Sequence, residues 1–212
     1  SFQAVTLPHT NKLFPHHNFD NLDYQFISTY RKRFDFSPKS AEDQTVFLDF
    51  DGVMLACTVY LNGVLLTEHL GGYISFSVNI TDTLTEGENV LTVFVDSRER
   101  KDIPPYGHLV DYLTFGGIYR DVFLRIVNPT HMENLFVRPT DVLTTPQLAC
   151  DVRLNQIGPG LSLKAQLLDP AGQEIAVTSA TPDQATTNLA FPALPEVNLW
   201  DLDAPTLYTV QV

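Results

Sequence analysis

Short stretches in which apolar and polar residues alternate, separated by turn residues, run through the whole of this sequence. Alternation of this kind sends every second side chain to the same face of a β-strand. In residues 90–96, for example, Leu91, Val93 and Val95 would share one buried face. The sequence shows no pattern long enough for a helix of three turns, and a single turn at 83–86 is the most that we expect. The chain is therefore predicted to be all-β.

Turn residues mark where these strands connect. Asn62-Gly63 separates two short strand patterns and favours a two-residue hairpin, because both residues accept the positive φ angles of a type I′ turn. Asp169-Pro-Ala-Gly172 predicts a second turn, with its proline preset for the first central position. Residues 86–89 predict a third turn, which would lead into the apolar strand described above.

Asn128-Pro129-Thr130 predicts a boundary between two domains, because proline cannot donate to a sheet ladder and the segment falls between strand patterns. Residues 1–129 would form one β-sandwich. Residues 130–212 contain further strand patterns at the spacing typical of an immunoglobulin-like sandwich. These patterns cover residues 133–138, 148–155, 161–168, 173–178, 186–191 and 207–212.

The composition argues against several classes of protein. The chain has 212 residues, 44% of them apolar, and a net charge of −12 with a pI near 4.7. A chain this acidic is a poor partner for nucleic acid or for anionic membranes. No apolar stretch approaches the ~18 residues of a membrane span. The N-terminus lacks the basic and apolar regions of a signal peptide, which leaves the compartment open but favours the cytoplasm over secretion.

Residue types that often bind metals or act as nucleophiles form no recognisable site. Cys57 and Cys150 are far apart and lack metal-ligand spacing, so we expect two separate buried thiols rather than a disulfide. The histidines show neither i, i+4 pairing nor a carboxylate at ligand spacing, and no zinc site is expected. The sequence contains neither a G-x-S-x-G nucleophile motif nor a glycine-rich phosphate loop before a helix.

Residues 111–124 form the most informative motif of the chain and read Asp-Tyr-Leu-Thr-Phe-Gly-Gly-Ile-Tyr-Arg-Asp-Val-Phe-Leu. The pair Gly116-Gly117 would let the backbone turn or pass close to another surface, because glycine carries no Cβ. Arg120 and Asp121 are adjacent, so on a strand they would point to opposite faces and could not simply pair with each other.

Several motifs along the chain resemble one known family. The run at 111–124 resembles the signature of the sugar-binding domain of glycoside hydrolase family 2, which includes β-galactosidases, β-glucuronidases and β-mannosidases. A W-x-F strand that usually precedes the other family motifs is missing here. The remaining landmarks occur in the family's order at 5–9 (V-x-L-P-H), 30–34 (Y-R-[KR]-x-F), 50–63 (F-x-G-V and A-x-V-Y-x-N-G), 69–73, 87–91 and 199–208 (L-W-x-x-x-x-P-x-L-Y).

The resemblance implies a sugar-binding jelly roll at 1–129 and an immunoglobulin-like sandwich at 130–212 that lacks its last strand. Family members retain anomeric configuration with two glutamates about 5 Å apart, and both lie on a (β/α)8 barrel. A barrel needs about 250 residues, so we expect this chain to be an inactive part of a larger β-glycosidase. Its partners would be its own barrel and β-linked glycosides, by default β-galactosides. A stand-alone carbohydrate-binding module and a purely structural module are the alternatives.

The resemblance also implies roles for single residues. Asp111 would reach the barrel mouth and accept hydrogen bonds from sugar hydroxyls, whereas on its own it reads as a loop aspartate that caps a turn. Tyr119, Arg120 and Asp121 would join the two glycines in a structural motif. Arg120 is expected to be buried against carboxylate or carbonyl partners, with direct ligand contact as the alternative. No cofactor, metal or catalytic residue is expected in this chain, although the intact enzyme would use a monovalent cation or Mg2+.

A second sandwich without its final strand would have one unpaired edge. Exposed backbone groups at such an edge favour strand pairing with another copy. We therefore expect a homo-oligomer, which sedimentation at high protein concentration would detect.

Overall fold

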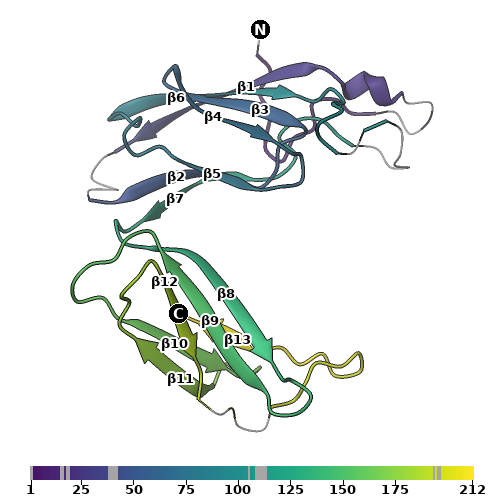
Figure 1. The fold of residues 1–212 in the computed structure, drawn as a ribbon. Helices are drawn as coiled ribbons and strands as arrows, with labels where there is room; N and C mark the ends of the chain where they lie inside the picture. The colour runs from purple at the N-terminus through teal and green to yellow at the C-terminus, as the bar shows by residue number, and fades with distance from the viewer. Residues whose placement is uncertain are drawn as a thin grey trace. The chain divides into compact units, whose positions relative to one another are not determined.

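The computed structural model describes residues 2–14, 17, 20–37, 43–104, 106–107, 114–192, 194 and 197–212. The chain divides into two compact units, Ser1–Pro129 and Thr130–Val212 (Figure 1). Within the described ranges the only helical element is the short 3-10 helix η1 (Asn21–Tyr24), and every other regular element is a strand. The all-β prediction is therefore confirmed. No helix in this described part is long and apolar enough to cross a membrane.

The first unit is a sandwich of two antiparallel sheets, which face each other in Figure 1. Inward side chains of both sheets form one core, to which β2, β3 and β6 each contribute three buried residues. Each fully buried Val, Leu or Phe in such a core contributes about 1.5–3 kcal/mol. The first sheet has the order β1 (Ile27–Phe36), β6 (Gly87–Asp96), β3 (Ala56–Leu61), β4 (Val64–Leu70), and the second has β5 (Phe76–Asn79), β2 (Thr45–Phe50), β7 (Val122–Val127).

Strand β6 lies in the middle of the first sheet and follows the predicted alternation. Leu91, Val93 and Val95 are all buried in the core, which confirms that they share one face. The predicted turn at 86–89 is wrong, because β6 already begins at Gly87 and pairs there with Phe36 of β1. The polar residue Asn89 does not end the strand, because its buried side-chain amide is hydrogen-bonded. Its Oδ1 accepts the Thr85 amide, and its Nδ2 donates to the Thr85 carbonyl.

The hairpin between β3 and β4 has the turn that the sequence predicts. Asn62 and Gly63 adopt φ angles of 53° and 83°, as a type I′ turn requires. The Asn62 side chain also ties the hairpin to β6, because its Oδ1 accepts the Val90 amide at 2.9 Å and its Nδ2 donates to Asn89 Oδ1 at 2.8 Å. One residue therefore sets both the turn and its contact with the neighbouring strand.

The second unit is a sandwich as well, and each of its two sheets has three strands. The six strands predicted for it are confirmed. Its core contains Cys150, Val152, Ala165 and Leu189, all almost fully buried. Within the described residues β13 has a paired strand on one side only, so association through this edge stays a prediction. The sheets have the orders β12 (Thr186–Ala190), β9 (Gln147–Leu154), β8 (Met132–Thr140) and β11 (Glu174–Ala180), β10 (Leu163–Leu168), β13 (Thr209–Gln211).

The two cysteines are free thiols, one in the core of each unit. This confirms the expectation of two separate buried thiols. Burial raises the pKa of Cys57 to about 12, because the surrounding apolar side chains disfavour the thiolate. The Cys150 pKa is raised for the same reason.

Both thiols should resist modification while the chain is folded. Only a thiolate attacks a disulfide reagent, and at neutral pH both buried groups stay protonated. We expect no reaction of the native chain with an aromatic disulfide reagent and reaction of both cysteines after unfolding in urea. Rapid labelling of the native chain, or the absence of labelling after unfolding, would contradict this description.

Candidate functional site

Asp111, the predicted sugar contact, lies in the segment 108–113, outside the residues that the structure describes. Its role therefore stays a prediction. The site is defined instead by the described residues on either side, 96–104, 106–107 and 114–121. Together with the segments that contact them, these residues determine where the chain enters and leaves the loop.

The pair Gly116-Gly117 is buried where no side chain would fit. A Cβ on Gly116 would lie 2.4 Å from Ser97 Oγ and 2.7 Å from Asn11 Nδ2. Gly117 has a φ of +110°, and its Cβ would lie 2.6 Å from the Tyr30 hydroxyl. Both positions are therefore restricted to glycine by close packing, and Gly117 also by its backbone conformation.

Three chain segments meet at this pair, and we call them the glycine clasp: residues 9–11, 53–55 and 116–118. The His9 amide donates to the Ile118 carbonyl at 2.7 Å, and the Asn11 amide donates to the Gly116 carbonyl at 2.9 Å. On the other side, Met54 and Gly117 exchange two backbone hydrogen bonds of 2.9 and 3.2 Å. The clasp thus holds the chain in place shortly after the segment 108–113.

Side chains complete the clasp in a way that the sequence did not reveal. Ser97 is buried, donates from Oγ to the Met54 carbonyl at 2.8 Å, and accepts a bond of 3.2 Å from Asn11 Nδ2. Asn11 Nδ2 also donates to the Tyr24 carbonyl at 3.3 Å, which fixes the orientation of the amide. The buried Asn11 Oδ1 has no donor within the described part of the chain. No motif marks Asn11 or Ser97, because their contacts join distant segments.

Tyr119, Arg120 and Asp121 lie between the clasp and β7. The Tyr119 hydroxyl donates to the Gly72 carbonyl at 2.6 Å, and partial burial raises its pKa. The expected burial of Arg120 is wrong. Its side chain is exposed and makes a 3.3 Å bond to the Asp51 carbonyl, with the guanidinium 5.1 Å from the Tyr119 ring centre.

The cause is that β7 begins only at Val122, so the expectation that Arg120 and Asp121 stand on a strand is also wrong. Asp121 is exposed and contributes its backbone carbonyl, which accepts the Asp51 amide at 3.0 Å. Arg120 crosses the surface of Gly52, where a Cβ would come within 2.9 Å of its Cδ. These residues hold the approach to β7 against the 51–52 turn.

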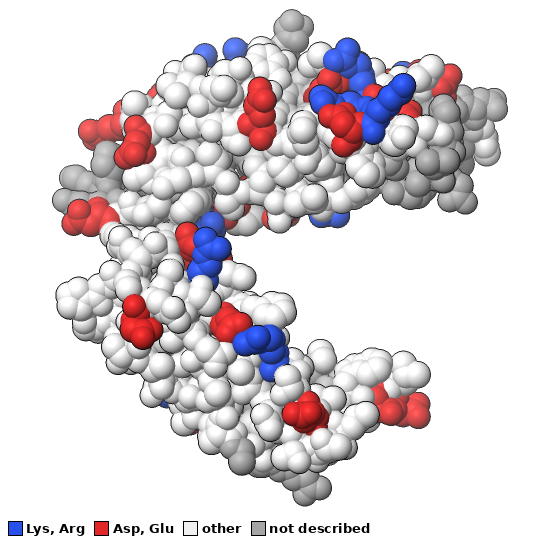
Figure 2. All heavy atoms as spheres, viewed as in Figure 1, with Lys and Arg blue, Asp and Glu red and all other residues white. Residues whose placement is uncertain are grey.

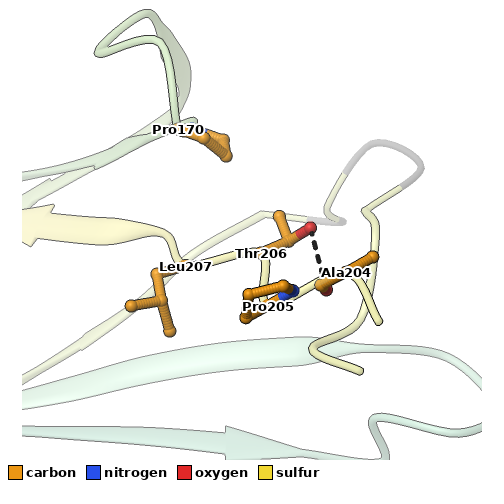
Figure 3. A pocket seen from close by; sticks show the side chains of 5 residues that line it. All are labelled: Pro170, Ala204, Pro205, Thr206 and Leu207. Atoms are coloured by element: carbon orange, nitrogen blue, oxygen red, sulfur yellow. Dashed lines mark hydrogen bonds between the residues drawn. The ribbon is translucent and has the colours of Figure 1, made fainter. Parts of the chain in front are cut away.

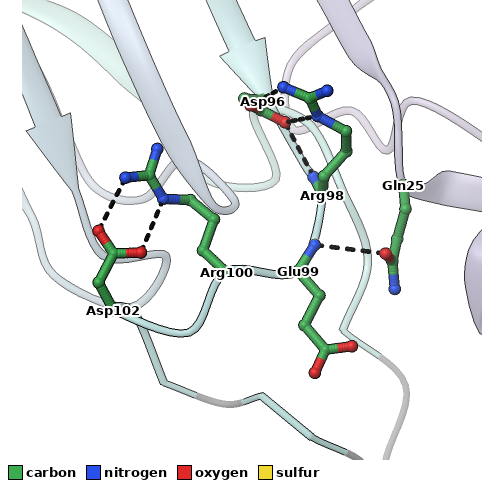
Figure 4. Close-up of polar contacts among 6 residues, drawn as sticks. All are labelled: Gln25, Asp96, Arg98, Glu99, Arg100 and Asp102. Atoms are coloured by element: carbon green, nitrogen blue, oxygen red, sulfur yellow. Dashed lines mark hydrogen bonds and ion pairs between the residues drawn. The ribbon is translucent and has the colours of Figure 1, made fainter.

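The segment before the loop carries two ion pairs between residues two apart in the sequence (Figure 4). Arg98 binds Asp96 through Nε at 2.9 Å and Nη2 at 2.7 Å. Arg100 binds Asp102 in the same manner at 3.0 and 2.7 Å. Hydrogen bonds from the arginines lower the pKa of both carboxyl groups. In Figure 2 one area of the first unit has basic side chains next to acidic ones, while other acidic side chains of this unit stand apart.

Both sides of the loop are tied to the end of the 3-10 helix. Before the loop, the Glu99 amide donates to Gln25 Oε1 at 3.3 Å, and the Glu99 carboxylate accepts the amide of Gly107. After the loop, the hydroxyls of Tyr24 and Thr114 share a hydrogen bond of 2.7 Å. Neighbouring residues of η1 and its C-terminal end therefore fix the described residues on both sides.

The described residues contain no group of three or more His, Cys, Asp or Glu side chains that could bind a metal ion. Asp111 lies outside them, so they do not test a cation site that includes it. A hollow of about 480 Å3 is found in the second unit, lined by Pro170, Ala204, Pro205, Thr206 and Leu207 (Figure 3). None of these side chains titrates or acts as a strong nucleophile, so the hollow has no catalytic chemistry.

Comparison with known proteins decides the family. A family model described as glycosyl hydrolase 2 galactose-binding domain-like matches residues 11–123, which is more than half of the chain. The chain belongs to glycoside hydrolase family 2. The resemblance noted in the sequence is thereby confirmed, and the matched range contains the glycine clasp except for its first residues.

Individual family 2 relatives agree with this assignment. A β-galactosidase of Thermoanaerobacter pseudethanolicus is 49% identical over 64% of this chain, and one of Thermoanaerobacterium thermosulfurigenes is 36% identical over all of it. The crystal structure of a Bacteroides uniformis β-glucuronidase matches 98% of the chain with 27% identity and a TM-score of 0.83.

The chain spans only a part of each of these family 2 proteins. It covers 18% and 31% of the two β-galactosidases and 26% of the β-glucuronidase chain. Proteins named β-galactosidase and proteins named β-glucuronidase both match this chain. These matches establish the family but do not distinguish between the two glycosides.

Gly117→Ala should destabilise the first unit by at least about 2 kcal/mol, because the new methyl group meets backbone and hydroxyl atoms at a positive φ. Thermal or urea unfolding of the chain measures the change. Gly158→Ala is the matched control: its Cβ meets nothing within 4 Å and its φ is not positive, so stability should change little or rise slightly. Equal effects of the two substitutions would contradict the packing argument.

Proposed function

We propose that the intact protein is a retaining β-glycosidase that hydrolyses β-galactosides. The observation that carries this proposal is the 36% identity over the whole chain to a β-galactosidase. β-Glucuronides are the second candidate, because a β-glucuronidase matches the fold of nearly the whole chain. In such an enzyme two glutamates of a separate catalytic barrel would perform the chemistry.

In this proposal the chain supplies scaffold and one wall of the substrate pocket. Asp111 accepts hydrogen bonds from sugar hydroxyls, and a carboxylate suits this task because charge-assisted bonds are stronger than neutral ones. The support is indirect: the described residues on both sides of 108–113 are held by hydrogen bonds, from Glu99 to Gly107 and from Tyr24 to Thr114. A loop with anchored ends can present a side chain with little loss of conformational entropy on binding.

A cation remains part of the proposal for the intact enzyme only. Asp111 is the residue of this chain that would contact it, and a carboxylate is a ligand that both Mg2+ and monovalent cations accept. The cation would supply positive charge near the sugar hydroxyls. We propose no other cofactor for this chain.

In the full-length protein, Asp111→Ala should lower kcat/KM for nitrophenyl β-galactoside about a hundredfold, which corresponds to about 2.7 kcal/mol of transition-state binding. The loss should appear without a change in melting temperature. Asp82→Ala serves as the control, because Asp82 is an exposed turn residue and its removal should leave kcat/KM unchanged.

Parallel assays with nitrophenyl β-glucuronide and β-mannoside identify the glycoside. Activity on β-glucuronide alone would replace the β-galactoside proposal and keep the family. Full activity of the Asp111→Ala enzyme would show that this aspartate has no part in substrate binding.

A further inference from the structure

The outer face of the second sheet in the first unit carries a cluster of side chains that the proposed catalytic role leaves unexplained. In β2, the inward residues are Val46, Leu48 and Phe50, so Phe47 and Asp49 point away from the core. Cross-strand partners share a face, and the register places Phe123 and Arg125 of β7 beside them. We call these four residues the outer cluster: Phe47, Asp49, Phe123 and Arg125.

Asp49 and Arg125 of the outer cluster form an ion pair. Arg125 Nε donates to Asp49 Oδ2 at 2.6 Å, and Arg125 Nη2 donates to Oδ1 at 3.3 Å. Asp49 is only 8% exposed although it lies on the outer face of the sheet. A carboxylate has about four acceptor positions, and the hydrogen bonds described for Asp49 use two of them. The Asp49 side chain is 11% exposed and the Arg125 side chain 39%.

Each member of this pair has an aromatic residue as its cross-strand partner. The Arg125 guanidinium lies over the Phe47 ring, 4.5 Å from its centre, in a cation–π contact. Phe123 stands directly opposite Asp49 in the register and is 45% exposed. On the other side of β2, the exposed Ser77 of β5 is the cross-strand partner of Asp49. An exposed ring thus borders a fixed set of hydrogen-bonding groups.

The geometry points to a carbohydrate site: we propose that the outer cluster binds one neutral pyranose unit. The apolar C–H face of a pyranose would lie on the Phe123 ring, while its edge hydroxyls bond the Asp49 carboxylate and the Arg125 guanidinium. Neighbouring strands lie about 4.8 Å apart and alternate residues about 6.8 Å apart, so the cluster has the dimensions of a single sugar ring. The ion pair makes the cluster neutral, which favours an uncharged ligand over an anionic one.

The first sheet offers an internal comparison. Its outer face has a similarly exposed ring, Phe94, at 42%, in T-shaped contact with Tyr60 at 5.7 Å. The cross-strand partners of Phe94 are Thr29 and Thr58, which carry no charge. Exposure of an aromatic ring is therefore common to both faces, whereas a nearly buried, arginine-paired carboxylate stands directly opposite the ring in the outer cluster and not opposite Phe94.

The test is a titration of the chain with methyl β-galactoside, methyl β-glucoside and methyl β-glucuronide, followed by NMR. We expect a neutral glycoside to bind at millimolar concentration and to shift the amide signals of Asp49, Ser77, Phe123 and Arg125. Phe123→Ala should weaken binding at least about tenfold, which corresponds to 1.4 kcal/mol, while Phe94→Ala should leave the affinity unchanged. Both rings are exposed, so both variants should fold, and their melting curves verify this.

Three results would overturn the proposal: no binding of any glycoside, loss of affinity in Phe94→Ala rather than Phe123→Ala, or preference for the charged glucuronide. The first of these would mark the outer cluster as a contact surface for another domain instead. The titration does not involve hydrolysis, so its outcome is independent of the test of Asp111 in the full-length protein.

Discussion

The close approach of Gly117 to the Tyr30 hydroxyl and to the backbone of residues 9–11 is the contact on which the rest of the site depends. A positive φ and the lack of a Cβ let three distant segments exchange backbone hydrogen bonds in the glycine clasp. The clasp fixes the chain shortly after the segment 108–113, and the contacts of Tyr24 and Gln25 fix the described residues on both sides of that segment. A scaffold of this kind suits the proposed role of Asp111 in substrate binding.

Alternation along the strands lets β2 contribute both to the core and to the proposed sugar site. In β2, three side chains fill the core while Phe47 and Asp49 stand on the outer face. The same separation allows a sheet to carry a binding surface without weakening its core, because the two sets of side chains do not touch. The two proposed sugar contacts, Asp111 and the outer cluster, therefore depend on different parts of the first unit.

Local sequence patterns predicted the strands and turns well, whereas contacts between residues far apart in the sequence were not predicted. Asn62-Gly63 determines its own turn through φ, and the strands of both units follow from alternation. Arg120 was expected on a strand, but where β7 begins depends on hydrogen bonds to residue 51, which no local pattern encodes. The roles of Asn11 and Ser97 were not predicted for the same reason. The two residues are 86 positions apart in the sequence, and only the folded chain brings them into contact. The Asp49–Arg125 pair likewise depends on strand register.

Hydrogen exchange at the clasp tests this account most directly. The amides of His9, Asn11, Met54 and Gly117 donate its backbone bonds, so they should exchange only when the first unit unfolds, as slowly as the amides of β6. Exchange about tenfold or more faster than in β6 would show that the clasp opens locally. In that case the glycine pair would not hold the loop in place, and the proposed positioning of Asp111 would lose its structural basis.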